Sequence, residues 1–557
     1  MTRSSADLLD GYLRQVFDDD PILATNRGDR VRDGRLPVTE PEALAASRAW
    51  RQRFVRELGD LPPTDDPQGE LDRTVARLDA EAFLAEADAV APQARCPYWY
   101  VERLGDAIND LLTVDSLPQD VRADALVDRM RGGPRYLDGA ERALDSQLTP
   151  PAYVDMGIEA CVGLAGLLSN SVPAFASANA GVLGRELEAV ATRLGNRLQE
   201  FLRFLNRFRD SAQGTWRSGR DRFDWLLKNE HLLPLDALEV AEIGAQRMEE
   251  ELQGLAAAAR RLDPDASWRA VVRDRERRHP DADSLLDAYR AAVERARQHT
   301  VEAALVSIPA EEECRLAWLP DYLRSSLPMG VMKLSPPFDT DMLTTFFITR
   351  PEGSLTPAQM EAHLRSHSFP FIESIAGHET YPGHHLQRVH HKAATQRSPI
   401  RRYLMSSVMI EGWGLYVESL QVEGGFPMNP GDQLFRARNR LWRAARLVID
   451  TGLHAGSMTF DEAVTILTEK VGLGIRMAQG EVRRYQRHDN PTYPSSYLLG
   501  ADAIARLRDE MGVGPGAPQA SIRSFHDRFL GFGSVPVSLI ANMLRGQDPR
   551  SWISCDR

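Results

Sequence analysis

The sequence predicts a mainly α protein with one small β-sheet. Over most of the chain, apolar residues recur with the period of a helix, and these segments are rich in Ala, Arg, Glu and Leu. Between about Ser307 and Pro351 the pattern changes to short β-rich runs separated by proline and glycine. With 557 residues, the chain can bury a large core in two domains or in one very large domain.

Residues 1–305 are predicted to form an N-terminal helical region. Its clearest helical patterns run from Asp236 to Leu262 and from Asp283 to Ala304. Prolines such as Pro234 recur at intervals that fit loops between helices. Residues 306–557 are predicted to form a second region, a small sheet followed by helices, which is integrated with the first region into one unit.

The predicted sheet lies just before a cluster of histidines. Thr344 to Thr349 is the best strand candidate, and the runs Leu316 to Leu319 and Gly330 to Leu334 are further short apolar segments. From Thr356 onward the helical pattern resumes. Because a strand edge can hold an extended peptide by backbone hydrogen bonds, we expect this sheet to form one wall of a cleft beside the histidines.

Composition limits the partners and the compartment. The formal net charge is −12 and no long basic run occurs, which argues against nucleic acid or an anionic membrane as the main partner. Residues 1–20 lack the apolar core of a signal peptide, and no stretch approaches the apolar length that spans a bilayer. We therefore expect a cytoplasmic protein with no membrane partner, and the oligomeric state stays open.

The four cysteines lie far apart, and none belongs to a C-x-x-C pair. This spacing favours neither a cysteine zinc site nor a dense disulfide framework. We expect all of them to be small buried apolar side chains, namely Cys96, Cys161, Cys314 and Cys555.

Seven of the thirteen histidines fall between His363 and His391. Three of them belong to the segment His378-Glu379-Thr380-Tyr381-Pro382-Gly383-His384-His385. In the H-E-x-x-H zinc motif, histidines at i and i+4 bind one metal while the glutamate acts as general base. Here proline occupies the position of the second histidine. On a regular helix, the next two histidines would stand roughly 9 and 10 Å further along the axis, too far for zinc.

Pro382 and Gly383 offer a way to close that distance. Proline clashes with the carbonyl four residues back, and glycine permits backbone angles that are closed to other residues. A bulge or break at these residues would bring His384 alongside His378, although geometry alone does not decide between His384 and His385 as the ligand. The alternative is a helix–turn–helix corner whose histidines only cap or pack.

A third ligand is expected from Met409 to Glu418, a segment that is apolar on most sides. Glu411 and Glu418 are seven residues apart and share one helical face, and a buried carboxylate is costly unless it is paired or bound to metal. One would be a ligand and the other would orient a histidine from behind. Gly412 and Gly414 would let another backbone approach closely. The alternative is a buried salt bridge to one of the arginines between Arg436 and Arg446.

These residues resemble the DUF885 family, bacterial proteins of unknown function. The similarity comprises H-E-x-x-P-G-H-x-x-Q at His378 to Gln387, E-G-W-x-x-Y-x-E at Glu411 to Glu418, D-T-G-L-H at Asp450 to His454, E-V-x-R-Y at Glu481 to Tyr485 and S-Y-x-x-G at Ser496 to Gly500. These motifs cover roughly the last 200 residues densely and are specific as a set. The family is similar in fold to the helical M32 carboxypeptidases, so the resemblance implies a large helical metallopeptidase-like fold with a deep cleft.

The resemblance also assigns roles. Since the residue after P-G-H varies in the family, it favours His384 as the ligand, so the predicted metal ligands are His378, His384 and Glu411, for one Zn²⁺ ion. Glu418 and His385 are expected to support these ligands from behind. Glu379 is the expected general base, with Tyr497 and His454 as further catalytic candidates, and Arg484 and Tyr485 as candidates for substrate binding.

The leading functional prediction is a zinc-dependent metallopeptidase, in its narrower form a carboxypeptidase that acts on short peptides. One alternative is a metal-dependent amidase that acts on a small non-peptide amide. Another is a non-catalytic helical protein that uses the cleft to hold a ligand. Retention of Glu379 beside His378 argues against the last, because a purely structural zinc site has no use for an adjacent carboxylate that binds no metal.

Overall fold

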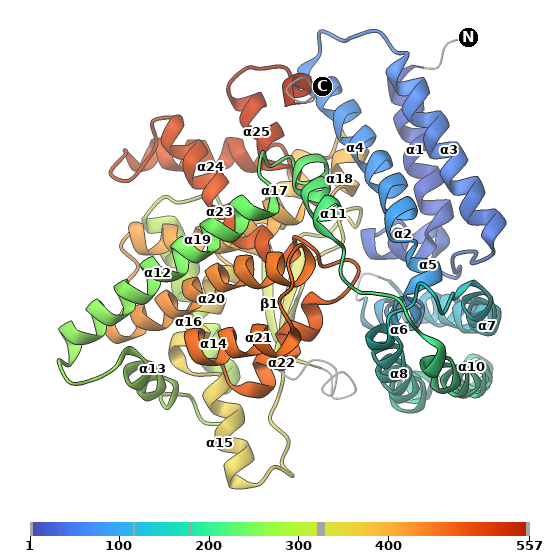
Figure 1. Ribbon diagram of the computed structural model, residues 1–557, viewed down its shortest axis with the longest axis horizontal. Coiled ribbons are helices and arrows are strands. Elements are labelled where there is room, and N and C mark those ends of the chain that lie inside the picture. Colours follow the sequence, from blue (N-terminus) through green and yellow to red (C-terminus); the bar gives the residue numbers. More distant parts are fainter. Residues whose placement is uncertain (1–3, 115–116, 179–180, 320–328, 553–557) are drawn as a thin grey trace. The chain divides into compact units, whose positions relative to one another are not determined.

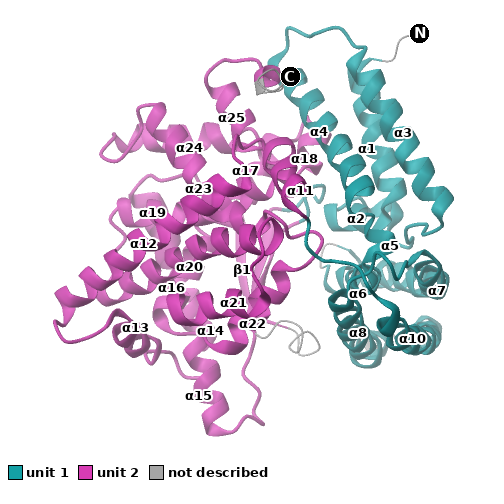
Figure 2. Cartoon of the chain, viewed as in Figure 1, with its two compact units in different colours: residues 1–218, 336–341 teal, residues 219–335, 342–557 magenta. Residues whose placement is uncertain are grey.

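The computed structural model describes residues 4–114, 117–178, 181–319 and 329–552, and within these ranges the protein is mainly helical with one three-stranded sheet (Figure 1). The predicted fold class is thereby confirmed. The chain forms two compact units, Met1–Ser218 with Pro336–Asp341, and Gly219–Ser335 with Met342–Arg557 (Figure 2). The boundary thus falls at residue 218 rather than at the predicted 305, because hydrophobic periodicity marks the buried face of a helix without showing which partner covers it.

The first unit is built from helices joined by short turns. They are α1 (Ser5–Asp19), α2 (Pro21–Arg27), η1 (Arg30–Arg32), α3 (Pro41–Gly59), α4 (Pro67–Ala89), α5 (Pro92–Arg95), α6 (Pro97–Thr113), α7 (Gln119–Ala143), α8 (Pro151–Gly166), η2 (Leu167–Ser171), α9 (Val172–Ala178), α10 (Val182–Phe208) and η3 (Arg209–Ser211). In α10, Leu187, Leu194, Leu198 and Leu205 lie at helical spacing and are fully buried. This apolar face packs against α7 and α8 and contributes to one continuous core.

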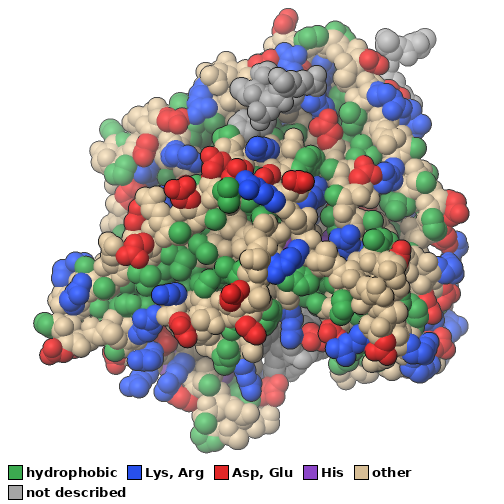
Figure 3. Space-filling model, in the orientation of Figure 1, with side chains coloured by type: hydrophobic (Ala, Val, Ile, Leu, Met, Phe, Trp, Pro, Cys, Tyr) green, Lys and Arg blue, Asp and Glu red, His purple; other side chains and the backbone are tan. Residues whose placement is uncertain are grey.

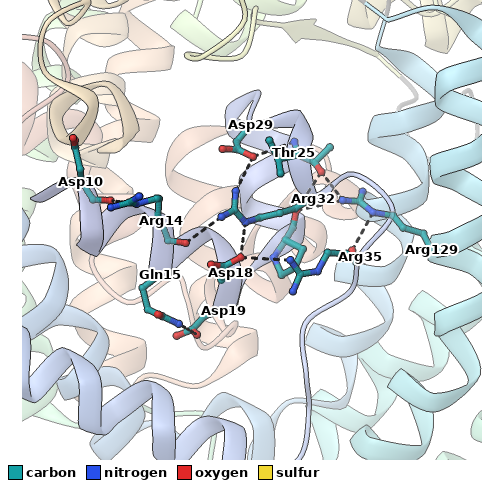
Figure 4. Close-up of polar contacts among 12 residues, drawn as sticks. Asp10, Arg14, Gln15, Asp18, Asp19, Thr25, Asp29, Arg32, Arg35 and Arg129 are labelled. Atoms are coloured by element: carbon teal, nitrogen blue, oxygen red, sulfur yellow. Dashed lines mark hydrogen bonds and ion pairs between the residues drawn. The ribbon is translucent and has the colours of Figure 1, made fainter. Parts of the chain in front are cut away.

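Arginines link the helices of this unit through satisfied polar contacts (Figure 4). Arg32 pairs with Asp18 at 2.9 Å and with Asp29 at 3.0 Å. Arg129 is fully buried, and its guanidinium donates to the carbonyl of Ala107 at 2.6 Å and to the hydroxyl of Thr25. Because these buried groups have partners, the network has a structural role here.

One helical stretch of the first unit, Pro151–Ser177, is long and apolar enough to cross a membrane by length and composition. This corrects the expectation that no such stretch occurs. Tyr153, Val154, Cys161 and Leu164 from this stretch are buried within the unit, but only 28% of its most apolar window is buried. Core helices of soluble proteins pass the same test, so the stretch is weak support for a membrane span.

The second unit carries the sheet and the histidine segment. Its elements are α11 (Arg220–Trp225), η4 (Leu226–Glu230), α12 (Ala237–Leu262), α13 (Trp268–Glu276), α14 (Leu285–Glu302), β1 (Glu313–Trp318), β2 (Gly330–Lys333), β3 (Leu343–Ile348), α15 (Pro357–Ser366), α16 (Phe369–Glu379), α17 (His384–Ala394), α18 (Pro399–Tyr403), α19 (Ser407–Glu423), α20 (Pro430–His454), α21 (Phe460–Thr465), η6 (Ile466–Val471), α22 (Ile475–Tyr485), α23 (Tyr493–Glu510), α24 (Gln519–Leu530), α25 (Val537–Leu544) and η7 (Pro549–Trp552). Long helices pack in pairs, α12 along α20 and α19 along α23.

The sheet has the strand order β1-β3-β2, with β1 parallel and β2 antiparallel to β3. The prediction of a strand at Thr344 to Thr349 is confirmed by β3, which is offset by one residue. The hydroxyl of Thr344 lies 2.6 Å from Nδ1 of His385, so the sheet adjoins the histidine segment as expected.

The packing of α19 against α23 explains why position 412 is a glycine. A Cβ on Gly412 would lie 2.6 Å from the Cα of Gly500, so glycine is needed at both positions for the two helices to meet. This confirms the expected close backbone approach at Gly412. The pair matters for the site because α19 carries Glu411 and Glu418, and α23 begins with the tyrosines described below.

Two of the three described cysteines are buried, and the surface carries charges of both signs (Figure 3). Cys96 and Cys161 are buried and Cys314 is half-buried, all three are free thiols, and Cys555 lies outside the described residues. On the face shown in Figure 3, acidic and basic side chains are interspersed over the part of the chain that the structure describes.

Candidate metal centre

The helix break predicted at the Pro-Gly pair is present. Helix α16 ends at Glu379 and α17 begins at His384. A Cβ on Gly383 would lie 1.8 Å from the carbonyl oxygen of His378, so only glycine fits this turn. The break places the imidazole rings of His378 and His384 with their centroids 4.8 Å apart.

Helix α19 holds this turn in place. The indole of Trp413 donates to the carbonyl of Pro382 at 2.9 Å, and the amide of Gln421 donates to the carbonyl of Tyr381 at 3.1 Å. Trp413 and Gln421 are both fully buried. The same helix therefore fixes the histidine turn and supplies the predicted carboxylates.

His378, His384 and Glu411 converge. Their potential ligand atoms all lie within 4.8 Å of one another, and Nε2 of His384 is 3.7 Å from a carboxylate oxygen of Glu411. A Cβ on Gly414 would come within 2.9 Å of both imidazoles. Gly414 therefore makes room for the two rings, not for another backbone as the sequence suggested.

The donor set fits zinc. Two imidazole nitrogens and one carboxylate oxygen are the ligand types of hydrolytic zinc sites, which keep a fourth position for water. Tetrahedral ligands at about 2.0–2.2 Å from zinc stand about 3.4 Å apart. Since the three ligand atoms lie within 4.8 Å of one another, no pair would have to close by more than about 1.4 Å.

Glu418 occupies the supporting position predicted for it. Nδ1 of His378 donates to its carboxylate at 2.9 Å, and both side chains are buried. Burial favours the neutral forms, but this hydrogen bond outweighs burial, raising the pKa of His378 and lowering that of Glu418. The bond fixes the ring so that Nε2 is the nitrogen left for a cation.

Glu411 is held by tyrosines from α23. The hydroxyl of Tyr493 donates to its carboxylate at 2.6 Å and lies 3.3 Å from the hydroxyl of Tyr497. Burial alone would raise the pKa of Glu411, but the charge of His384 and the Tyr493 hydrogen bond lower it, so the carboxylate is ionised and ready to bind a cation. Tyr493 was missed from the sequence. Its spacing of four from Tyr497 puts both on one helical face, a signal that could have found it.

Glu379 lies beside the converging ligands without joining them. It is half-buried at the end of α16, and its charge acts on His378. Among the residues that the structure describes, its carboxylate has no hydrogen-bond or ion-pair partner. A carboxylate in this condition is free to accept a proton.

His385 does not support the metal ligands as predicted. It is fully buried, with Nδ1 at 2.6 Å from the hydroxyl of Thr344 and Nε2 at 2.7 Å from the carboxylate of Glu312. Glu312 also accepts from the hydroxyl of Tyr381 at 2.5 Å. We call these four residues the His385 cluster. Consecutive helix residues point about 100° apart, so His385 turns toward the sheet while His384 faces the metal ligands.

Tyr485, which the sequence predicts to bind substrate, makes contacts within the protein. It is fully buried, donates to Glu481 at 2.6 Å and accepts from Nε of Arg446 at 2.9 Å, so its hydroxyl is not available to a substrate. Arg484 is partly exposed and pairs with Glu481 at 3.2 Å. Burial would raise the pKa of Glu481, but the charges of Arg446 and Arg484 outweigh it and lower the pKa to about 2.

The predicted catalytic residue His454 is also engaged elsewhere. It is buried at the end of α20, and its Nε2 lies 2.7 Å from the carbonyl oxygen of Tyr485. This nitrogen donates to the backbone and thereby joins α20 to α22. The histidine of the D-T-G-L-H pattern therefore makes a packing contact through Nε2 in this structure.

The fold and the converging side chains define a mainly helical protein with a His-His-Glu cluster between α16, α17 and α19. The chain belongs to a family described as "Bacterial protein of unknown function (DUF885)", which it matches over residues 21–544. Comparison with curated proteins finds no match.

Two solved structures share the fold. One is a putative lipoprotein of unknown function from Shewanella oneidensis, with a TM-score of 0.81 and 17% identity over 98% of this chain and 100% of that one. The other is a putative lipoprotein from Colwellia psychrerythraea, with a TM-score of 0.80 and 17% identity over 98% of this chain and 99% of that one.

These comparisons contradict the predicted cytoplasmic location. Both solved structures of this fold are described as putative lipoproteins, a class of membrane-anchored or extracytoplasmic proteins, and not as cytoplasmic proteins. The prediction failed because the composition and charge of a folded domain describe its solubility and not its compartment.

Proposed function

We propose that this protein is a zinc-dependent hydrolase, and specifically a metallopeptidase. The observation that carries the proposal is the convergence of His378, His384 and Glu411 next to Glu379, whose carboxylate has no partner among the described residues. A structural zinc site is closed by four protein ligands, whereas this set of three leaves a position for water. An adjacent carboxylate that binds no metal is the arrangement of hydrolytic sites.

The residues divide the chemistry between them. When bound, zinc supplies a Lewis acid that polarises the substrate carbonyl and lowers the pKa of water toward about 7. Glu379 accepts the proton of the attacking water on its carboxylate and passes it to the amine nitrogen as the C–N bond breaks. Glu418 keeps Nδ1 of His378 occupied, so that Nε2 stays directed at the site.

Tyr497 is the proposed donor to the substrate carbonyl oxygen. Its hydroxyl lies next to that of Tyr493, which is itself committed to Glu411. Burial, and then the charge of Glu411, raise the pKa of Tyr497, so the hydroxyl keeps its proton near neutral pH. A protonated phenol can stabilise the developing oxyanion.

The proposal extends to architecture. Because the family resembles the helical M32 carboxypeptidases, we propose a cleft that admits a peptide to Glu379 and Glu411, and the mainly helical fold supports this proposal. The partial exposure of both carboxylates supports an opening on this side of the cluster.

Metal analysis followed by a peptide assay tests the proposal. The purified protein should contain about one equivalent of zinc by elemental analysis and should release amino acids or short fragments from a defined peptide pool, as followed by mass spectrometry. Chelation should abolish release, and zinc should restore it. A protein that binds zinc but cleaves neither peptides nor simple amides would favour the ligand-binding alternative.

A further inference from the structure

We propose that Arg443 and Arg446 form a carboxylate-binding site beside the metal centre, and that the substrates are peptides ending in a free α-carboxylate. The inference rests on the proposed hydrolase function and names its substrate class. It also moves the carboxylate-binding role from Arg484 and Tyr485, which the sequence suggested, to two arginines of α20.

The two arginines surround Tyr497. The guanidinium carbon of Arg446 lies 4.6 Å from the centre of the Tyr497 ring, and that of Arg443 lies 5.7 Å from it. The Tyr497 hydroxyl is 3.3 Å from that of Tyr493, which donates to the predicted ligand Glu411. Arg443 is also close enough to His378 and Glu418 for its charge to act on both. The arginines are therefore neighbours of the metal centre.

The charges around these arginines do not balance. Glu481 is shared between Arg446 at 3.1 Å and Arg484 at 3.2 Å. Glu418, the carboxylate whose charge acts most on Arg443, is already hydrogen-bonded to His378. Arg443 makes no hydrogen bond or ion pair with any residue that the structure describes. Arg446 is 4% exposed, yet its NH1 is buried and has no hydrogen-bond partner among the described residues.

An unpaired buried guanidinium nitrogen is costly, and an incoming anion would remove that cost. A carboxylate suits the planar fork of arginine, since its two oxygens can accept parallel N–H bonds. Both arginines project from the middle of the long helix α20, so within the described part of the chain they are not flanked by the backbone donors of a phosphate-binding loop. Carboxylate is therefore the anion we favour.

The position of the site selects the substrate. If Tyr497 donates to the carbonyl oxygen of the scissile bond, the arginines beside its ring lie about one residue further along the substrate, or roughly 4 Å. In a peptide cut at its last bond, that position holds the α-carboxylate. Internal peptide bonds place a neutral amide there, which would leave the guanidinium groups unpaired.

The first measurement is binding without catalysis. We would titrate N-acetyl-phenylalanine and N-acetyl-phenylalaninamide into the zinc-loaded protein and follow them by saturation-transfer NMR. The acid should bind roughly tenfold or more tightly than the amide, as expected for a charge-assisted pair. Arg443→Gln should reduce this difference to less than about twofold, and Arg443→Lys should keep part of it, because the charge remains while the fork is lost.

The matched control is Arg440→Gln. Arg440 lies one turn earlier on α20 and its guanidinium is already paired with Glu251 at 2.8 Å. This variant should keep the full preference for the acid. An equal loss in Arg440→Gln and Arg443→Gln would overturn the proposal, as would equal binding of acid and amide to the parent protein. Displacement of the acid by inorganic phosphate at lower concentration than by acetate would overturn it in favour of a phosphate site.

A hydrolysis assay distinguishes failure of the carboxylate-binding site from failure of the proposed hydrolase function. A pool of tripeptides with free carboxyl ends should be cleaved roughly tenfold or more faster than the same pool with amidated ends. If both pools are cleaved equally and cleavage depends on Glu379, the hydrolase stands and the carboxylate site is wrong. If neither pool is cleaved while Arg443 still selects the acid, the carboxylate site stands and the hydrolase is wrong.

Discussion

The two consecutive histidines at the start of α17, His384 and His385, differ in the partners of their ring nitrogens. His384 directs a ring nitrogen toward Glu411 and His378, whereas both ring nitrogens of His385 are already occupied by Thr344 and Glu312. Both side chains are buried. Burial therefore does not separate a candidate metal ligand from a structural histidine, but the partners of its ring nitrogens do.

The His385 cluster and the metal cluster of His378, His384 and Glu411 differ in the same way, namely in whether their polar atoms already have partners. In the His385 cluster, Thr344 contacts His385 and Tyr381 contacts Glu312, so both ring nitrogens of His385 are occupied. Glu312 also pairs with Arg297 at 3.4 Å, which leaves its carboxylate fully engaged. In the metal cluster, Glu418 holds His378 and Tyr493 holds Glu411, while Nδ1 of His384 lies 3.4 Å from the side-chain oxygen of Gln387. The remaining ligand atoms of all three residues face a common point. The His385 cluster therefore stabilises the fold, whereas the metal cluster is arranged to bind a cation.

The largest effect should come from His384→Ala. Removing one of three ligands leaves two, too few for a stable zinc site, so both metal and hydrolysis should be lost. Zinc content after dialysis and turnover on the peptide pool measure the outcome, with circular dichroism to confirm folding. If the variant retains full zinc while a His385→Ala variant loses it, the assignment of the two histidines is reversed.

Glu379→Gln should separate metal binding from catalysis. The substitution keeps the shape of the side chain but removes its basicity, so zinc content should stay normal while hydrolysis falls by roughly 10² or more. Near-normal turnover would eliminate Glu379 as the general base. Glu373→Gln is the control on the same helix, because Glu373 pairs with Arg295 at the surface, and it should leave turnover unchanged.

The sequence predicted the fold class and the core of the site because both depend on local patterns. Helical periodicity, the β-rich run in β3 and the helix-breaking Pro382-Gly383 all act over a few residues. The domain boundary was missed because α12 packs along α20, and a contact across nearly 200 residues leaves no mark in either segment alone.

The supporting residues were predictable only in part. Glu418 was found because it shares a helical face with Glu411, but Glu312 precedes β1 and meets His385 only through the tertiary fold. The motifs around Tyr485 and His454 were noticed, yet they mark packing between α20 and α22. A motif shows that a residue matters, and only the structure shows which atoms it contacts.

Glu418→Gln tests whether zinc binding depends on the charged hydrogen bond between Glu418 and Nδ1 of His378. A glutamine still accepts from Nδ1 of His378 but lacks the charge that favours a strongly basic imidazole, so zinc affinity should fall by about 10–100-fold. Competition with a zinc-selective chelating dye measures the change. Unchanged affinity would mean that Glu418 only fills space, and an additional collapse of the fold would place it with the structural network instead.

The smallest effect should come from Tyr381→Phe in the His385 cluster. The substitution removes only the hydroxyl that donates to Glu312, which keeps its contact with His385. One oxygen of a buried carboxylate then loses a partner, so the free energy of unfolding should fall by about 1–3 kcal/mol in urea titrations. Zinc affinity should change by less than about twofold, because no atom of the metal cluster loses a contact. If zinc affinity fell more than tenfold while stability stayed constant, the His385 cluster would belong to the metal site, and the contrast between the two histidines would not hold.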